Sequence, residues 1–327
     1  MLSKSLGIDI SKSKLDVALY EASEYQLATF SNDRAGHRAL VKWLKKRKAK
    51  GTRVCIEATG RYGEQVAVYL HGRGYPVSLV NPARIKAYAS SQLKRNKTDR
   101  EDAKVIAHFC ATQEPSLWEP PSPEVQELRA LTRHLESLKA DRAREKNRKQ
   151  SGVPSATVLQ TIEEHINFLN EQIAALEERI EELIDQDPTL REKRDLLTTI
   201  PGIGDNVAAK FIAEVPDVTR FDSAAELAAY AGLTPKNVHS GSSVHRPGRL
   251  VKMGSVRFRT TLYMPALSAM QYNPIIQPLV ARLEAKGKKR MTIVGAVMRK
   301  LVHIAYGVLK HGRPFDPNYL VNVQGAA

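Results

Sequence analysis

Four carboxylates occupy positions from which they could form one metal site. Asp9 lies in the apolar run 7–10, and Glu57 ends a second short apolar run. Asp99 and Asp102 stand three residues apart at the start of a helical stretch, so they share one helix face. Carboxylate oxygens suit Mg²⁺ or Mn²⁺, and two such ions about 4 Å apart can stabilise the attacking and leaving oxygens of a phosphoryl transfer. The pattern therefore indicates cleavage or strand transfer on a nucleic-acid backbone.

Each carboxylate also has an ordinary structural explanation. Sugar kinases and actin-like ATPases also have an aspartate after a Gly-Ile pair in their first strand. A glutamate at the end of a strand is usually an ordinary solvated side chain. Asp99 alone would suit a helix N-terminus, where the helix dipole favours negative charge. A kinase or ATPase of that fold needs a second glycine-rich phosphate-binding turn, and we find none in the sequence. The order and spacing of the four carboxylates together favour the metal site.

The elements around these residues indicate an α/β domain of the RNase H-like (RuvC-like) class, because three strands precede alternating helices and strands. The expected strands are 5–10, 14–20, 25–31, 54–57 and 75–80, and the expected helices are 37–48, 62–73, 84–90 and 99–111. In such a fold the first strand, the end of a neighbouring strand and the last helix converge at one edge of the sheet. We therefore expect the four carboxylates to lie together.

A proline-rich stretch at 115–123 separates this domain from a helical middle, so we place domains at 1–118, 119–188 and 189–327. In the middle, apolar residues recur at spacings of three and four: Leu159, Ile162, Ile166, Leu169, Ile173, Leu176, Ile180 and Leu183. Isoleucine at one position and leucine at the other favour a two-stranded parallel coiled coil between chains. The alternative is an internal antiparallel hairpin with the helix 125–150, through Leu128, Leu131, Leu135 and Leu138.

Charge and composition favour a polyanionic partner. The 327 residues carry a net charge of +15, which indicates nucleic acid before membrane. Between Glu226 and Asp316 there are fifteen Lys and Arg against one acid, whereas 163–195 holds eleven acids against four Lys and Arg.

The two cysteines lack ligand spacing, which fits a reducing cytoplasm. No apolar stretch approaches the roughly 18 residues of a membrane span, and no signal peptide begins the chain. We expect a soluble, cytoplasmic protein.

The last third carries two further motifs. Residues 200–204 form a helix-hairpin-helix pattern, whose Gly202 and Gly204 would let backbone amides approach a phosphate; a tight turn that packs two helices is the alternative. In the polar loop 239–249, Ser240 lies beside glycine and cations, a setting that suits attack on a phosphodiester, although such loops are usually linkers. The residues expected to contact nucleic acid are Arg95, Lys97, Arg100, Gly202, Gly204, Lys236, Arg246, Arg249, Lys252, Arg257 and Arg259.

Taken together, these motifs resemble those of DEDD-type transposases of the insertion-sequence family numbered one-hundred-and-ten, which are related to the Piv site-specific DNA invertases. The motifs are GIDISKSKLDVAL (7–19), IEATGRYG (56–63), NPARIKAYASSQLKRNKTDREDA (81–103), IPGIG (200–204), AGLTP (231–235), SGSSV (240–244) and TLYMPAL (261–267). The resemblance implies that Asp9, Glu57, Asp99 and Asp102 are the catalytic, metal-binding tetrad of a RuvC-like domain. It also implies that Ser240 is the catalytic serine of a C-terminal transposase domain.

The resemblance implies a Mg²⁺-dependent (or Mn²⁺-dependent) recombinase guided by a structured bridge RNA that pairs with donor and target DNA. It further implies a homodimer that assembles into a tetramer, in which the serine of one subunit completes the RuvC-like site of another. One alternative is a DNA invertase or Holliday-junction resolvase without an RNA guide. Another is a nucleic-acid-binding scaffold without catalysis. A covalent link between Ser240 and DNA would distinguish the recombinase from a plain nuclease.

Overall fold

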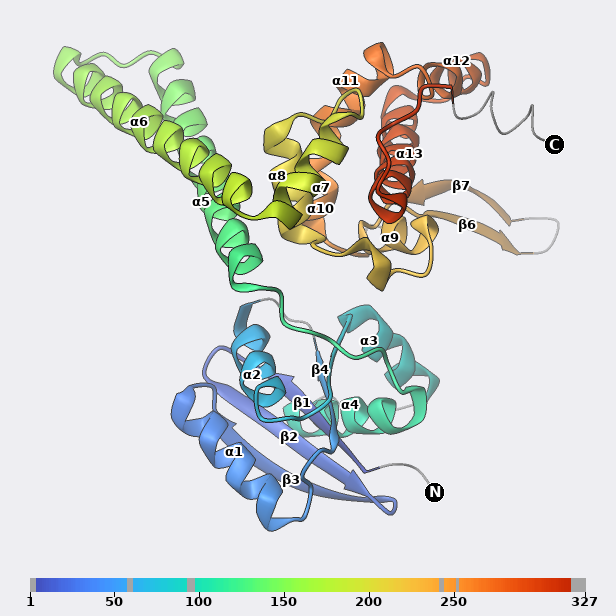
Figure 1. Ribbon diagram of the computed structural model, residues 1–327. Coiled ribbons are helices and arrows are strands. Elements are labelled where there is room, and N and C mark those ends of the chain that lie inside the picture. Colours follow the sequence, from blue (N-terminus) through green and yellow to red (C-terminus); the bar gives the residue numbers. More distant parts are fainter. Residues whose placement is uncertain (1–3, 58–60, 93–97, 241–243, 251–252, 319–327) are drawn as a thin grey trace. The chain divides into compact units, whose positions relative to one another are not determined.

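The protein, represented by a computed structural model, divides into two compact units, Met1–Pro120 and Pro121–Ala327 (Figure 1). The structure describes residues 4–57, 61–92, 98–240, 244–250 and 253–318, with the side chains of 61 and 236–249 left out. Each unit has its own apolar core. One core runs through the second unit from Val125 to Val308, so the helical middle and the C-terminal region share it.

A five-stranded mixed sheet forms the centre of the first unit. Its strands are β1 (Ser5–Ile10), β2 (Lys14–Glu21), β3 (Glu24–Ser31), β4 (Arg53–Glu57) and β5 (Val77–Val80). Their order is β3-β2-β1-β4-β5, with β1, β4 and β5 parallel and β2 antiparallel to both neighbours. Short turns join the antiparallel strands, whereas helices form the longer connections that parallel strands require. The mixed α/β architecture and all five strands predicted from the sequence are confirmed.

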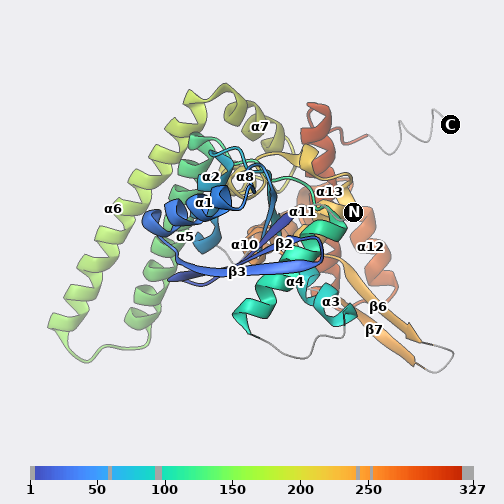
Figure 2. The same cartoon turned by 90° about the horizontal axis from the view of Figure 1, so that it is seen from below.

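Helices cover both faces of this sheet (Figures 1 and 2). They are α1 (Arg34–Lys46), α2 (Arg61–His71), α3 (Pro82–Ser91) and α4 (Asp99–Gln113). The side chains of Leu6 and Ile8 pack with those of α1 and α2, and Cys55 packs with α4 on the opposite face. Thr98 is the N-cap of α4, and its hydroxyl accepts a hydrogen bond from the Glu101 amide. This cap sets the first turn of α4, which carries Asp99 and Asp102.

The two cysteines lie between β4 and α4. Cys55 and Cys110 are both free and fully buried. A hydrogen bond between the two thiols, together with burial, raises the pKa of Cys55 far above its ordinary value. A thiol that stays protonated is a poor nucleophile and a poor metal ligand. Cys55 is therefore a buried structural residue of β4.

The second unit begins with two long helices, α5 (Pro123–Gln150) and α6 (Ala156–Gln186), which lie side by side in Figures 1 and 2. Lys149 pairs with Glu163 at 2.6 Å and Lys139 pairs with Glu177 at 2.6 Å, as in an antiparallel hairpin. The buried seam residues of α6 are Ile162, Ile166, Leu169, Ile173, Ile180 and Leu183, with Leu128 and Leu135 buried on α5.

The sequence analysis favoured a second chain as the partner of the apolar seam of α6, and this was wrong. In the structure α5 of the same chain covers the seam. The turn from Ser151 to Ser155, with Gly152 at a φ of +87°, reverses the chain. Because this short turn tethers α5 to α6, α5 is present at a high effective concentration and outcompetes the same helix of a second molecule. A homodimer has to use another surface, and it remains a prediction.

The rest of the second unit is mainly helical and carries one two-stranded ribbon, β6–β7. Its elements are α7 (Pro188–Thr198), α8 (Asp205–Glu214), η1 (Val218–Arg220), α9 (Ala224–Tyr230), β6 (Pro235–Ser240), β7 (Val244–Leu250), α10 (Val256–Thr261), α11 (Tyr263–Tyr272), α12 (Gln277–Ala285) and α13 (Arg290–His311). Contrary to the sequence expectation, α13 is long and apolar enough to cross a membrane. Its inner face, including Val297 and Leu301, is buried in the core, which accounts for that composition.

Candidate active site

Strand pairing places three acidic side chains in a row across the sheet. Ile8 of β1 lies opposite Ile56 of β4, so the next residues, Asp9 and Glu57, are neighbours where the two parallel strands end. On the other side, Asp9 pairs with Asp16 of β2. Side chains alternate along a strand, and these three share the face that α4 covers. The register therefore brings Asp16, Asp9 and Glu57 to one level of one face.

Helix α4 crosses this face in direct backbone contact with β1. A Cβ atom at Gly7 would lie 2.2 Å from the backbone nitrogen of Ala107 and 2.3 Å from the carbonyl oxygen of Ala103. The Ser5 hydroxyl also donates a buried hydrogen bond of 2.8 Å to the Ala107 carbonyl. Because Asp102 directly precedes Ala103, this close contact brings the first turn of α4 to Asp9.

Replacing Gly7 with alanine is expected to lower the free energy of unfolding by about 3 kcal/mol, because the added methyl group overlaps the α4 backbone. Urea unfolding followed by tryptophan fluorescence would measure this, since Trp43 and Trp118 both lie in the first unit. Gly72→Ala is the matched control, because its Cβ would meet neighbours at an ordinary 3.4 Å. Equal midpoints for the two variants would contradict close contact at Gly7.

The carboxylates of this edge influence one another. Burial is the largest cause of a raised pKa of Asp9, and the charges of Asp102 and Asp99 follow it. The charge of Asp16 adds a smaller effect, while the amide of Ile10, which donates to Asp9 Oδ1 at 3.0 Å, acts in the opposite direction. Asp9, Asp99 and Asp102, predicted to act together, therefore share one negative field. The strand register places Glu57 next to Asp9 on the same face of the sheet.

Two residues that the sequence analysis missed complete this edge. Asp16 is 4% exposed, and its carboxylate accepts a 2.7 Å hydrogen bond from the Thr29 hydroxyl. Lys14 Nζ lies 3.1 Å from Asp16 Oδ2 and 2.6 Å from Asp99 Oδ2, and these hydrogen bonds raise the pKa of Lys14, the one to Asp99 more. The signal in the sequence was an aspartate that interrupts the apolar alternation of β2. Lys14 supplies one positive charge and ties α4 to β2.

The donor chemistry fits a divalent cation, although the carboxylates do not form a closed ligand sphere. Within the described residues, no three His, Cys, Asp or Glu side chains meet the spacing of a metal site. The atoms that converge are nevertheless carboxylate oxygens, the donors that Mg²⁺ and Mn²⁺ prefer. Their mutual repulsion, visible in the raised pKa of Asp9, is relieved by any cation placed among them. The donor set at this edge is therefore of the chemical type that binds Mg²⁺ or Mn²⁺.

Ser240 lies in the second unit, at the end of a β-ribbon. Strands β6 and β7 pair antiparallel, and Ser240 is opposite Val244 at the last position before residues 241–243, which lie outside the described part. The same register sets Lys236 opposite Arg249 and Val238 opposite Arg246. Arg95, Lys97 and Lys252 also lie outside the described residues, whereas Arg100 is exposed on α4. Ser240 and the carboxylates thus belong to different units.

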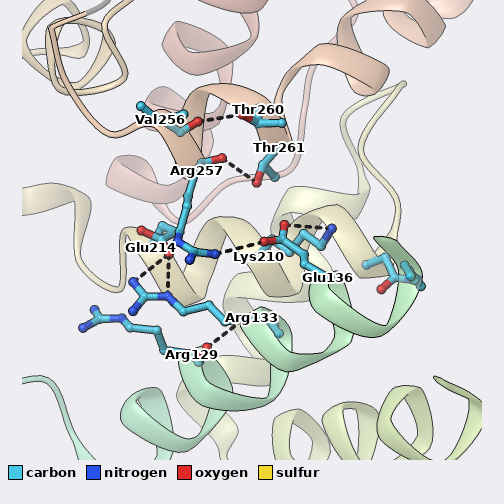
Figure 3. A network of polar contacts seen from close by, with 12 residues as sticks. Arg129, Arg133, Glu136, Lys210, Glu214, Val256, Arg257, Thr260 and Thr261 are labelled. Atoms are coloured by element: carbon cyan, nitrogen blue, oxygen red, sulfur yellow. Dashed lines mark hydrogen bonds and ion pairs between the residues drawn. The ribbon is translucent and has the colours of Figure 1, made fainter. Parts of the chain in front are cut away.

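Arg257 and Arg259 have partners inside the second unit. Figure 3 shows Arg257 of α10 directed at Glu136 of α5, at 3.5 Å, with Lys210 of α8 on the other oxygen of that carboxylate at 3.1 Å. Arg259 donates a 3.0 Å hydrogen bond to the carbonyl of Ala231. Both arginines therefore hold helices together, and the Arg257 side chain, 55% exposed, remains accessible.

The helix-hairpin-helix glycines differ in their surroundings. Gly202 has a φ of +106°, and a Cβ there would lie 2.9 Å from the carbonyl of Pro265 and 3.0 Å from Ala269 Cβ, so it packs against α11. Gly204 is open and begins α8. The hollow beside this helix start is lined by acids that include Glu177 and Glu181, which would repel a phosphate. The geometry favours the alternative, a turn that packs helices.

Two family models match the chain. One, described as a DEDD transposase of the IS110 type, matches residues 6–156, and the other, described as the transposase IS116/IS110/IS902 family, matches residues 194–281. Together they cover the sheet, the long helix α5 and much of the rest of the second unit, with α6 between the two matches. The matched regions contain all four predicted carboxylates and Ser240.

Known proteins resemble the chain over half or more of its length. The pilin gene-inverting protein of Moraxella bovis is 36% identical over 315 residues, which is 95% of this chain and 97% of that protein. The transposase for insertion sequence element IS1111A of Coxiella burnetii is 25% identical over 296 residues, covering 82% and 78% of the two chains. An uncharacterized 43.6 kDa protein of insertion element IS110 from Streptomyces coelicolor is 28% identical over 170 residues, covering 52% and 41%.

Proposed function

The chain belongs to the IS116/IS110/IS902 family of transposases, DNA recombination enzymes, and from that premise we propose a metal-dependent, RNA-guided DNA recombinase with a serine nucleophile. The observation that carries the proposal is the acidic edge of the first unit. There Asp9 lies in the field of Asp102 and Asp99, and the strand register adds Glu57. An enzyme that cleaves DNA can use these carboxylates to bind divalent cations, which stabilise the charge that develops on the reacting phosphodiester.

In this proposal Asp9, Glu57, Asp99 and Asp102 hold Mg²⁺ or Mn²⁺. When bound, the metal neutralises charge on the phosphate and favours ionisation of a nearby hydroxyl. Asp16 and Lys14 have a positioning role, because their contacts fix β2 and the start of α4 relative to β1. The Lys14 ammonium also balances part of the negative charge before DNA arrives.

Ser240 is the proposed nucleophile. Its Oγ atom forms a bond to phosphorus, the bond from phosphorus to one deoxyribose oxygen breaks, and the proton lost by the serine ends on that leaving oxygen. The product is a phosphoserine link that the hydroxyl of another DNA strand can reverse, which exchanges strands without an external energy source. Following the family resemblance, we place Ser240 of one subunit with the carboxylates of another, within a tetramer of two homodimers.

The proposed nucleic-acid contacts lie in both units. They are Arg95, Lys97 and Arg100 in the first unit and Lys236, Arg246, Arg249, Lys252 and the exposed Arg257 in the second. Support comes from the excess of fifteen Lys and Arg over one acid between Glu226 and Asp316. We leave Gly202 and Gly204 out, because Gly202 packs against α11 and acids line the hollow beside Gly204.

A guide RNA is the part of the proposal with the most direct test. Purified full-length protein, expressed together with its flanking non-coding DNA, is expected to retain one discrete structured RNA. Sequencing of the bound RNA checks this, and a matched preparation without the flanking DNA is the control. Recovery of only bulk cellular RNA, together with strand exchange by RNA-free protein, would remove the guide from the mechanism.

A second candidate is site-specific DNA inversion without a guide. The observation in its favour is the 36% identity with a pilin gene-inverting protein across 95% of the chain. Both candidates use the same acidic edge and the same serine. A plasmid on which two candidate sites lie in inverted orientation separates them, because RNA-free protein inverts the segment only under the second candidate.

A further inference from the structure

A basic hollow lies on the first unit, at the end of the sheet opposite the carboxylates. It has a volume of about 540 Å³, and its cationic lining residues are Lys4, Lys48, Lys50 and Arg53, beside one acid, Glu114. Lys4 directly precedes β1 and Arg53 begins β4. Asp9 is five residues along β1 from Lys4, roughly 17 Å at the rise of a strand. The hollow is therefore separate from the candidate active site.

The chain around this hollow is strongly basic. Seven Lys and Arg and no acid occur in 42–53. Lys4 and Arg53 are held in place: Lys4 pairs with Glu21 at 2.8 Å, and Arg53 donates a 2.8 Å hydrogen bond to the carbonyl of Pro115. Lys48 and Lys50 are exposed and have no side-chain hydrogen bond or ion pair with the described residues. Two positioned cations and two accessible ones thus share one hollow.

Lys48 occupies a position that backbone sterics would give to glycine. It has a φ of +50°, which is the left-handed backbone conformation in which residues other than glycine are strained. The Ala49 amide donates to the Leu44 carbonyl at 3.0 Å and the Lys48 amide to the Lys45 carbonyl at 3.1 Å, which is the Schellman arrangement at the end of α1. Glycine is the usual residue at this position. A lysine at a position that favours glycine is consistent with a use for its side chain.

The helix dipole does not account for the whole patch. Lys45 and Lys46, in the last turn of α1, are favoured by the negative end of the helix. Lys4 donates a 2.9 Å hydrogen bond to the carbonyl of Arg47, the C-cap of α1, so the helix end also accounts for Lys4. Lys48 and Lys50 follow the helix end and Arg53 begins β4, so the dipole does not account for these three. The alternative is a run of lysines that is merely solvated on the surface. Such a run would not be expected to line one hollow together with cationic residues from the starts of two β-strands.

We propose that this hollow binds the phosphodiester backbone of a double-stranded nucleic acid at a place remote from the reacting strand. The inference rests on the proposed function, which supplies nucleic acid as the partner. Lysines recognise phosphates as point charges and read no base sequence, so the contact positions a duplex without selecting its sequence. Duplex DNA and duplex RNA carry the same backbone phosphates, and the experiment distinguishes the two sources.

The test measures binding of labelled blunt DNA and RNA duplexes to the full-length protein by fluorescence anisotropy, in EDTA and over a salt series. K48E/K50E is expected to weaken binding of at least one duplex by about 10-fold and to flatten its log-log salt dependence by about 1.8, which is about 0.9 for each of two lost phosphate contacts. K48R/K50R preserves the charge and should bind as the unmutated protein does. Lys48→Gly should flatten the salt dependence by about 0.9 while keeping a melting temperature at or above that of the unmutated protein, since glycine relieves the strain.

Lys48→Gly separates binding from folding, because a variant that is more stable and binds more weakly has not failed to fold. A loss confined to the RNA duplex assigns the hollow to RNA, and a loss confined to the DNA duplex assigns it to DNA. Unchanged affinity and salt dependence of K48E/K50E with both duplexes would overturn the inference. An unmutated protein that binds neither duplex would instead overturn the proposed function.

Discussion

Replacing Ser240 by alanine is expected to abolish the covalent protein–DNA adduct and to lower recombination by about 10⁴-fold or more, as loss of a nucleophile does in other enzymes. The variant should still fold and bind DNA, because only one hydroxyl group at the end of β6 is removed. Denaturing gels of a reaction on labelled, nicked DNA measure the adduct, and a strand-exchange assay measures recombination. Ser240→Cys should keep a trace of activity, because a thiolate is also a nucleophile.

The neighbouring serines of the sequence are matched controls for this experiment. Ser242→Ala and Ser243→Ala each remove the same hydroxyl group and should leave the adduct in place. An adduct that persists in Ser240→Ala and vanishes in one of these controls would move the nucleophile to that serine. If the unmutated protein forms no adduct on any substrate, water is the attacking group and a plain RuvC-like nuclease is the better description.

The same variant tests whether the two sites act between subunits. Mixing Ser240→Ala protein with Asp102→Ala protein should restore part of the activity if the serine of one subunit meets the carboxylates of another. Neither protein alone has a complete site, so restored activity requires a mixed assembly. An inactive mixture, formed under conditions in which subunits exchange, would place both sites in one chain.

Replacing Asp102 by alanine is expected to lower recombination by about 10³-fold and to abolish stabilisation by metal. Asp102 contributes to the field around Asp9, and Mn²⁺ bound there should stabilise the folded protein in proportion to its occupancy. Melting temperatures with Mn²⁺ and with EDTA measure this independently of activity. The unmutated protein should gain stability from the metal, and Asp102→Ala should gain none.

The stability of the folded protein should depend on pH through Asp9, and the direction of this dependence can be stated. Burial and neighbouring carboxylates raise the pKa of Asp9 above 3.8, its ordinary value. The folded chain therefore holds this proton more tightly than the unfolded chain, and the associated stability is lost as pH rises through the folded pKa. In EDTA at neutral pH, Asp9→Asn should consequently melt at a higher temperature than the unmutated protein while being inactive.

Glu24→Gln is the control for both carboxylate variants, because Glu24 is an exposed acid at the start of β3. It should retain activity and the response to metal. Full recombination in EDTA, or an unchanged metal response of Asp102→Ala, would exclude metal binding by this edge. A lower melting temperature of Asp9→Asn in EDTA would mean that Asp9 stabilises the fold through its charge.

Local sequence patterns determined much of the acidic edge. Alternation along β1 and β4 sets Asp9 and Glu57 on the face opposite Leu6 and Ile8, and a spacing of three puts Asp99 and Asp102 on one side of α4. These are properties of single strands and helices, so they can be recognised without knowing what each element packs against. The mixed α/β class of the first unit followed from the same periodicities.

Only the tertiary structure decided which surfaces meet. The apolar seam of α6 fits a second chain or α5 equally well by its period, and the turn at Gly152 gave it to α5. The contact of Gly7 with Ala103 and Ala107, and the pairing of Lys14 with Asp99, join residues 85 to 100 positions apart in the chain. A local pattern reports the face that a side chain occupies, whereas its partner depends on the path of the whole chain.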